Sequence, residues 1–85
     1  MAGKYTPLEH HLRDLPPSQR VVTLSFEQVE RILNDKLPPS AYQYLAWWSY
    51  EKRPRQPEKL AIANAGWKMH AINLSQKWVR LVQAK

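Results

Sequence analysis

The sequence predicts an α+β fold of winged-helix type, with three helices and a small three-stranded antiparallel sheet in a single domain over residues 1–85. Three observations predict it. Helix-start signals occur three times between proline breakers, a short β-branched run follows the first helix, and two apolar stretches flank a polar turn near the C-terminus. In this order of elements, the early strand is expected to pair with the terminal hairpin.

The first helix is expected to begin at Thr6, which forms a capping-box signature with Glu9. Pro16 and Pro17 end it, because proline has no amide proton to donate. The next run, Val21–Leu24, is β-branched or apolar and too short for a helix, so it predicts a strand.

Two further capping boxes predict the second and third helices. Ser25 with Gln28 begins the second helix, and Ser40 with Gln43 begins the third after a turn that contains two prolines. The apolar stripe of the third helix continues as far as Trp48.

The rest of the chain predicts a loop, a short helical stretch and a hairpin. The segment Lys52–Pro57 combines three basic side chains with two prolines and is expected to be an exposed loop. Glu58–Ala65 is expected to be helical, with Gly66 as a left-handed stop. Trp67–Leu74 and Trp78–Val82 alternate as two strands, with a bulge where the alternation of the first one slips.

The basic charge is confined to one half of the chain. Residues 1–50 hold five basic and five acidic side chains, whereas residues 51–85 hold eight basic and two acidic ones and so the whole net charge of +6. Such asymmetry is typical of proteins that bind a polyanion, since neutralising phosphates releases counterions from nucleic acid. Alternatively, the excess Lys and Arg side chains only keep the surface of a small protein hydrated.

The expected site therefore combines phosphate contacts with limited base reading. No Lys or Arg occurs between Pro38 and Tyr50, so the third helix would read base edges with polar side chains. These are Ser40, Tyr42 and Gln43. The phosphate contacts are expected from Lys52, Arg53, Arg55, Lys59, Lys68, Lys77 and Arg80.

The adjacent pair Trp47 and Trp48 cannot both face the core, because neighbouring helical residues point about 100° apart. One of the two is expected to be partly exposed. With Tyr44 and Tyr50, Trp47 would then form a platform on which a base could stack. Alternatively, the second Trp covers the side of the sheet.

Several functional classes are not expected. The chain has no cysteine, so it has neither disulfides nor thiolate metal sites. The adjacent His10 and His11 cannot converge on one metal, and no nucleophile, carboxylate pair or glycine-rich phosphate loop indicates an enzyme or a cofactor. Without an apolar run of about 18 residues or a signal-peptide pattern, we expect a soluble cytoplasmic protein with no membrane partner.

Several motifs resemble an uncharacterised family of small bacterial and archaeal domains. They are Tyr5, Pro7 and Leu8; Ser25 and Phe26; Pro38, Pro39, Ser40 and Ala41; Trp47 and Trp48; Ala65, Gly66 and Trp67. The resemblance spans nearly the whole chain and implies an association with DNA, because relatives of this kind occur beside nuclease-like domains. The sequence departs from the family pattern after the Trp pair, where the basic loop replaces an asparagine-containing turn.

Taken together, these features predict a small DNA-binding domain, a regulator or accessory factor whose partner is duplex DNA. The alternative is a protein-interaction module, such as an inhibitor or antitoxin-like partner, that uses an exposed aromatic and arginine patch. A homodimer would be ordinary for a DNA binder, but the sequence leaves the oligomeric state open.

Overall fold

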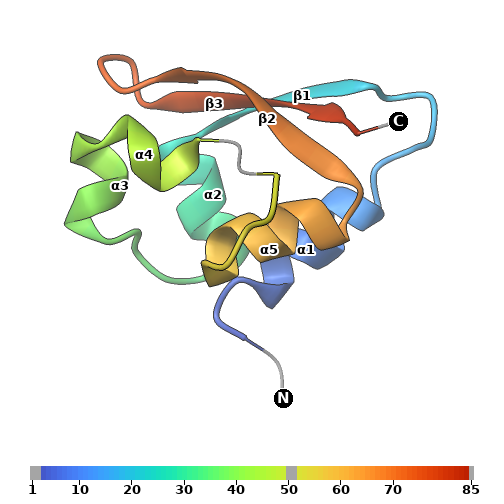
Figure 1. Cartoon of the computed structure of the whole chain (residues 1–85), viewed down its shortest axis with the longest axis horizontal. Coiled ribbons are helices and arrows are strands. Elements are labelled where there is room, and N and C mark those ends of the chain that lie inside the picture. The colour runs from blue at the N-terminus through green and yellow to red at the C-terminus, as the bar shows by residue number, and fades with distance from the viewer. Residues whose placement is uncertain (1–2, 50–51, 85) are drawn as a thin grey trace.

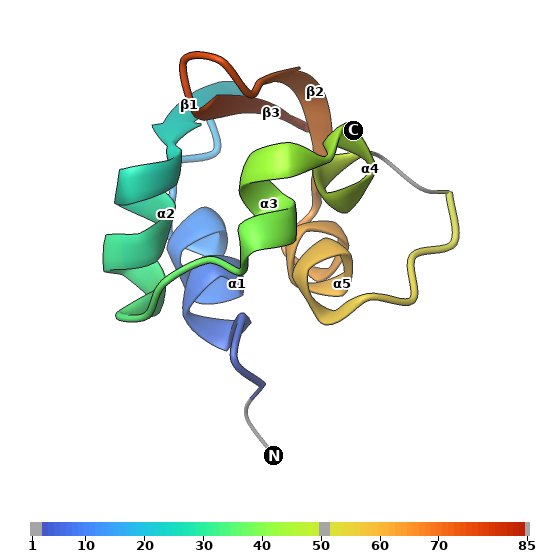
Figure 2. The ribbon, with the colours of Figure 1, turned by 90° about the vertical axis from the view of Figure 1, so that its left-hand side faces the viewer.

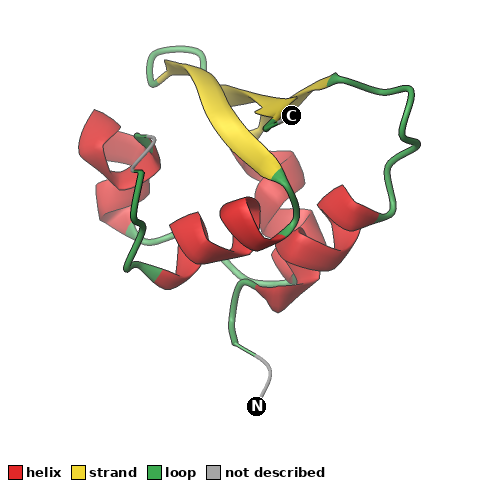
Figure 3. Cartoon of the chain, turned by 45° about the vertical axis from the view of Figure 1, so that its right-hand side comes forward, coloured by secondary structure: helices red, strands yellow, loops and turns green. Residues whose placement is uncertain are grey.

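The computed structural model describes residues 3–49 and 52–84, which form a layer of helices packed on a layer of strands (Figure 1). In order, the elements are α1 (Thr6–Arg13), β1 (Val21–Ser25), α2 (Phe26–Leu33), α3 (Pro39–Gln43), α4 (Leu45–Trp48), α5 (Pro57–Asn64), β2 (Trp67–Asn73) and β3 (Trp78–Gln83). The helices cover one face of the sheet, as Figures 1 and 3 both show. The predicted α+β class is confirmed. Within the described ranges, no helix is long and apolar enough to cross a bilayer.

The sheet has the strand order β1-β3-β2, and β3 runs antiparallel to both neighbours. The early strand therefore pairs with the terminal hairpin, as the sequence predicts. A register shift between Met69 and Ala71 marks the expected bulge and leaves His70 without a partner on β3. The predicted three-stranded antiparallel sheet is confirmed.

The core lies between the two layers and fixes their relative position. Phe26 at the start of α2 is 1% exposed, and its ring stacks on that of Trp48 with 5.0 Å between centroids. From the sheet, Val79 and Leu81 are each 1% exposed and pack on the same cluster. This burial of aromatic and aliphatic surface is the main stabilising contribution in a chain of this length.

The capping box predicted at the start of α2 is present. The Ser25 amide donates to Gln28 Oε1 at 2.8 Å, and the Gln28 amide donates to Ser25 Oγ at 3.0 Å. The box predicted at Thr6 is wrong, because Thr6 is already the first helical residue and its Oγ1 accepts from the Gly3 amide at 2.8 Å. Pro7 fits this shifted start, since proline is tolerated throughout the first turn of a helix.

The helix predicted over residues 40–48 begins one residue earlier and is broken in the middle. Pro39 is its first residue, so the predicted serine cap at Ser40 is wrong. At Tyr44 the backbone is extended, with φ −124° and ψ 123°, which separates α3 from α4. The break frees the Ala41 carbonyl to accept from Trp48 Nε1 at 2.8 Å. With α5 in the place of the predicted short stretch, the described residues contain five helices instead of three.

The predicted left-handed stop after α5 is confirmed at Gly66. Its φ is +84°, and a Cβ added there would meet no atom within 4 Å. A substitution at this position therefore tests the backbone conformation alone, without a steric clash.

We expect Gly66→Ala to lower the free energy of unfolding by about 1 kcal/mol, because the left-handed conformation costs an L-residue with a Cβ roughly that much. Gly66→Asn should lower the free energy of unfolding by less, since Asn tolerates this conformation. Urea denaturation of the three proteins measures both effects. Equal stability of all three would contradict the assignment of strain to the backbone.

Candidate nucleic-acid interface

One face of the sheet is left uncovered by the helices. Because Val79 and Leu81 point into the core, alternate residues of β3 point away from it, as the sequence predicts. The register of the strands extends this pattern to β1 and β2. We call the outward side chains of the three strands the open sheet face: Val21, Thr23, Ser25, Lys68, Ala71, Asn73, Trp78, Arg80 and Val82.

Arg80 lies at the centre of the open sheet face and is held in place by two neighbours. Its Nε donates to Thr23 Oγ1 at 3.1 Å, and its guanidinium carbon lies 5.0 Å from the centroid of the Trp78 ring. The Trp78 ring is itself oriented by a hydrogen bond from its Nε1 to Gln76 Oε1 at 3.1 Å. Among the described residues, no carboxylate pairs with Arg80. Its Nη groups are therefore available to an anion from outside.

The carboxylates of the described residues lie in the helix layer. All three ion pairs of the described residues are found there: Glu9 with Arg13, Glu27 with Arg31, and Asp35 with Lys4. By contrast, the sequence contains no Asp or Glu from Lys59 to Lys85, and β1 contains none either. The sheet layer therefore carries cations that no carboxylate of its own neutralises.

The predicted basic loop is exposed and lies on the side of α4, α5 and β2. Lys52, Arg53 and Arg55 are all exposed, and none forms an ion pair within the described residues. Figure 2 shows this segment, drawn in yellow, running outside the helices before it enters α5. The expectation of an exposed basic loop is confirmed, and its role in binding stays a prediction.

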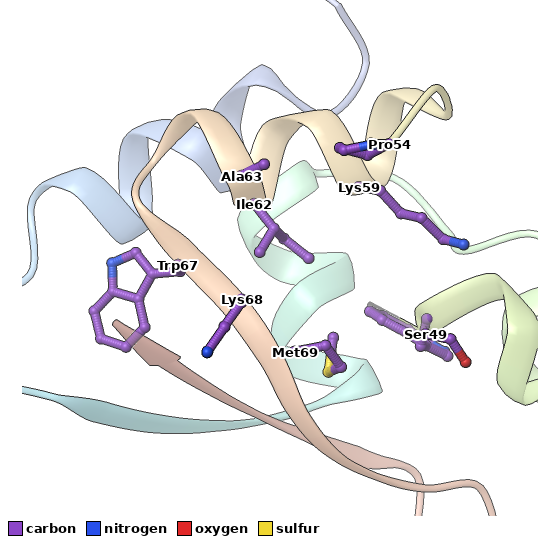
Figure 4. Close-up of a pocket in the computed structure, with 9 residues that line it drawn as sticks. Ser49, Pro54, Lys59, Ile62, Ala63, Trp67, Lys68 and Met69 are labelled. Carbon is purple, nitrogen blue, oxygen red and sulfur yellow. The ribbon is translucent and has the colours of Figure 1, made fainter. Parts of the chain in front are cut away.

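A small pocket of about 30 Å³ lies between this loop and the edge of the sheet (Figure 4). Pro54 of the loop, Lys59 of α5 and Lys68 of β2 all line it. Lys59 is only 9% exposed, and its side chain reaches from α5 toward Ser49. Lys68, in contrast, is exposed and faces Val82, which places it diagonal to Arg80. Two of the predicted phosphate contacts, Lys59 and Lys68, thus line one pocket at the edge of the open sheet face.

Lys77 lies apart from the other predicted phosphate contacts. It occupies the hairpin turn with φ +58°, and its Nζ lies 5.9 Å from the centroid of the Tyr42 ring. Glu27 and Glu30 line the same hollow, so Lys77 stands among acidic side chains. We therefore leave Lys77 out of the interface.

The predicted base-reading residues of α3 differ in how accessible they are. Gln43 is exposed, whereas Ser40 is half-buried. Tyr42 is also half-buried, and its hydroxyl donates to Glu30 Oε2 at 2.8 Å. Of the three, only Gln43 therefore presents an exposed side chain to a partner.

The predicted stacking residues do not form one platform among the described residues. Trp48 is 4% exposed and Trp47 is half-buried, so the expectation that one of the pair is partly exposed is confirmed. Trp47 meets Tyr5 edge-on at 6.1 Å between ring centroids and Trp48 edge-on at 4.7 Å. Tyr44 is 59% exposed, and Tyr50 lies outside the described residues.

Two residues of the site, Thr23 and Trp78, were not among the predicted contacts. The alternation of β3 does place Trp78 on the same face as Arg80, and this spacing is the sequence signal that identifies it. The role of Thr23 depends on the register between β1 and β3, which no local pattern specifies.

A family described as "Domain of unknown function (DUF7662)" matches residues 5–84. The chain belongs to this family. The resemblance to an uncharacterised family of small domains is thereby confirmed. No curated protein and no solved structure matches the chain. Membership of DUF7662 assigns no activity, so the geometry of the site carries the functional argument.

The contact between Glu30 and Tyr42 connects α2 to α3. Glu30 Oε2 accepts from the Leu37 amide at 2.9 Å as well as from the Tyr42 hydroxyl. Burial raises the pKa of Tyr42 to about 12, and the hydrogen bond and negative charge of Glu30, together with the charge of Glu27, add to the rise. The folded state therefore holds the Tyr42 proton more tightly than the unfolded state.

We expect Tyr42→Phe to lower the free energy of unfolding at neutral pH by about 1 kcal/mol, the usual contribution of one hydrogen bond. The contribution of Tyr42 should be complete below pH 10, its ordinary pKa, and should disappear as the pH rises toward 12. In urea denaturation between about pH 9 and pH 12, the free energies of unfolding of the wild type and the variant should thus converge. A constant difference over this range would contradict the assignment.

Proposed function

We propose that this domain binds nucleic acid, with the open sheet face and the basic loop making the phosphate contacts. The observation that supports the proposal best is the separation of charge between the two layers. The ion pairs lie with the helices, whereas Lys68 and Arg80 stand on a sheet without any carboxylate. Such a surface favours a phosphate backbone, because each phosphate that it neutralises releases condensed counterions.

This mode differs from that of a winged-helix protein bound to duplex DNA. In such a protein the helix after the turn enters the major groove, and here Gln43 of α3 would read the bases. The strand order β1-β3-β2 is compatible with that assignment. However, α3 has only five residues and no basic side chain, and Tyr42 is bound to Glu30. We therefore favour binding through the sheet.

A second candidate function is the binding of a protein partner at α3 and α4. Tyr44 is 59% exposed and its neighbour Leu45 is 54% exposed, which is unusual for two adjacent large apolar side chains. Aromatic side chains at the centre of an exposed patch are frequent contributors to protein interfaces. Binding at this patch would depend little on salt, which separates it from the first candidate.

The test compares two double variants with the same change of charge. Lys68→Gln with Arg80→Gln removes two cations from the open sheet face, whereas Arg31→Gln with Lys36→Gln removes two exposed cations near α2. Both lower the net charge from +6 to +4. Only the first pair should reduce the slope of log affinity against log salt, by about 1.4–1.8, since each phosphate contact contributes roughly 0.7–0.9.

Fluorescence anisotropy with a labelled oligonucleotide over a range of salt concentrations provides the slopes. Absence of oligonucleotide binding at every salt concentration would favour the protein partner at α3 and α4. Equal reductions in the two double variants would mean that net charge alone is responsible and would remove the open sheet face from the site.

The basic loop has its own test. We expect Arg53→Ala with Arg55→Ala to reduce the same slope by about two units without lowering the unfolding temperature, because both side chains are exposed and form no ion pair within the described residues. An unchanged slope would restrict the interface to the sheet.

A further inference from the structure

The open sheet face is too broad to enter a groove of duplex DNA. Its three strands are spaced about 4.8 Å apart, so the outer two are about 10 Å apart before their side chains are added. The major groove is about 12 Å wide and accepts an α-helix or a two-stranded ribbon. A duplex would thus contact the open sheet face only through phosphates, and its bases would remain out of reach.

The same face offers flat surfaces on which an unpaired base can stack. The Arg80 guanidinium and the Trp78 ring lie against each other at 5.0 Å, and the hydrogen bonds to Thr23 and Gln76 hold both in orientation. Bases that are free of a duplex stack on aromatic rings and on guanidinium planes. The exposed His70 of the bulge stands next to Ala71, which faces Arg80 across the strands.

The surroundings of Arg80 favour a deoxyribose. Val21 and Val82 face each other in the neighbouring row of the open sheet face, and Val21 is 47% exposed. A sugar that follows a phosphate bound at Arg80 would lie against these apolar side chains. Lys68 ends the same row beyond Val82, where it would bind the next phosphate. A ribose whose 2′-hydroxyl lies against the two valines would lose hydration without gaining a hydrogen bond from them, which disfavours RNA.

From these observations we propose that the ligand of the open sheet face is single-stranded DNA, with a base stacked on the Trp78–Arg80 pair and phosphates bound by Arg80 and Lys68. This inference rests on the proposed function and specifies its ligand. It assigns Trp78 a binding role, whereas Trp47, which packs on Tyr5, has none.

The test measures binding of a labelled thymidine oligonucleotide of about 12 nucleotides, a uridine RNA of equal length and a DNA duplex, all at one salt concentration. We expect the single-stranded DNA to bind most tightly. Trp78→Leu should weaken its binding about tenfold, because the ring is lost while an apolar side chain remains. Trp78→Phe should stay within about threefold of the wild type, and the control Trp47→Leu should bind as the wild type does.

Intrinsic fluorescence supplies a readout that does not depend on the folding of Trp78→Leu. Binding should quench tryptophan emission in the wild type, and the quenching should decrease in Trp78→Phe although binding persists. Tighter binding of the duplex, or an equal effect of Trp78→Leu and Trp47→Leu, would overturn the inference while leaving nucleic-acid binding intact. RNA bound as tightly as DNA would overturn the choice of DNA. Absence of binding to all three ligands would overturn the proposed function itself.

Discussion

The packing of one face of the sheet against the helices is the constraint on which the rest of the structure depends. Val79 and Leu81 of the central strand are 1% exposed because they close the core over Phe26. In a strand with alternating side chains, this burial determines where every neighbour points. It directs Trp78 and Arg80 away from the helices, to a surface that no described element of the chain covers.

The same division into layers separates the charges. In the helix layer, Lys4, Arg13 and Arg31 each form an ion pair with a carboxylate. Arg13, for example, pairs with Glu9 one turn away. In the sheet layer, Arg80 instead contacts a hydroxyl and an aromatic ring, neither of which neutralises it. These contacts restrict the motion of the guanidinium while leaving its charge available. A group that is already oriented loses less entropy when it binds an anion, which is why this arrangement suits phosphate recognition.

Local sequence patterns predicted those parts of the fold that local interactions determine. The capping box of α2, the left-handed glycine after α5 and the alternation of the hairpin each depend on a few neighbouring residues. The break at Tyr44 was not predictable in this way, because it accompanies the hydrogen bond from Trp48 to Ala41 in the core. For the same reason the site was only partly predicted. Arg80 was identified from its charge, but its contact with Thr23 joins residues 57 positions apart.

The central claim is that ligands bind on the side of the sheet that faces away from the helices. Amide chemical shifts of the ¹⁵N-labelled domain, recorded during titration with a thymidine oligonucleotide, test it most directly. Our account predicts that the largest shifts occur at Thr23, Ala71, Trp78 and Arg80, with little change in α1 and α2. Shifts concentrated around Tyr44 in α3 and α4, with those four amides unmoved, would contradict it.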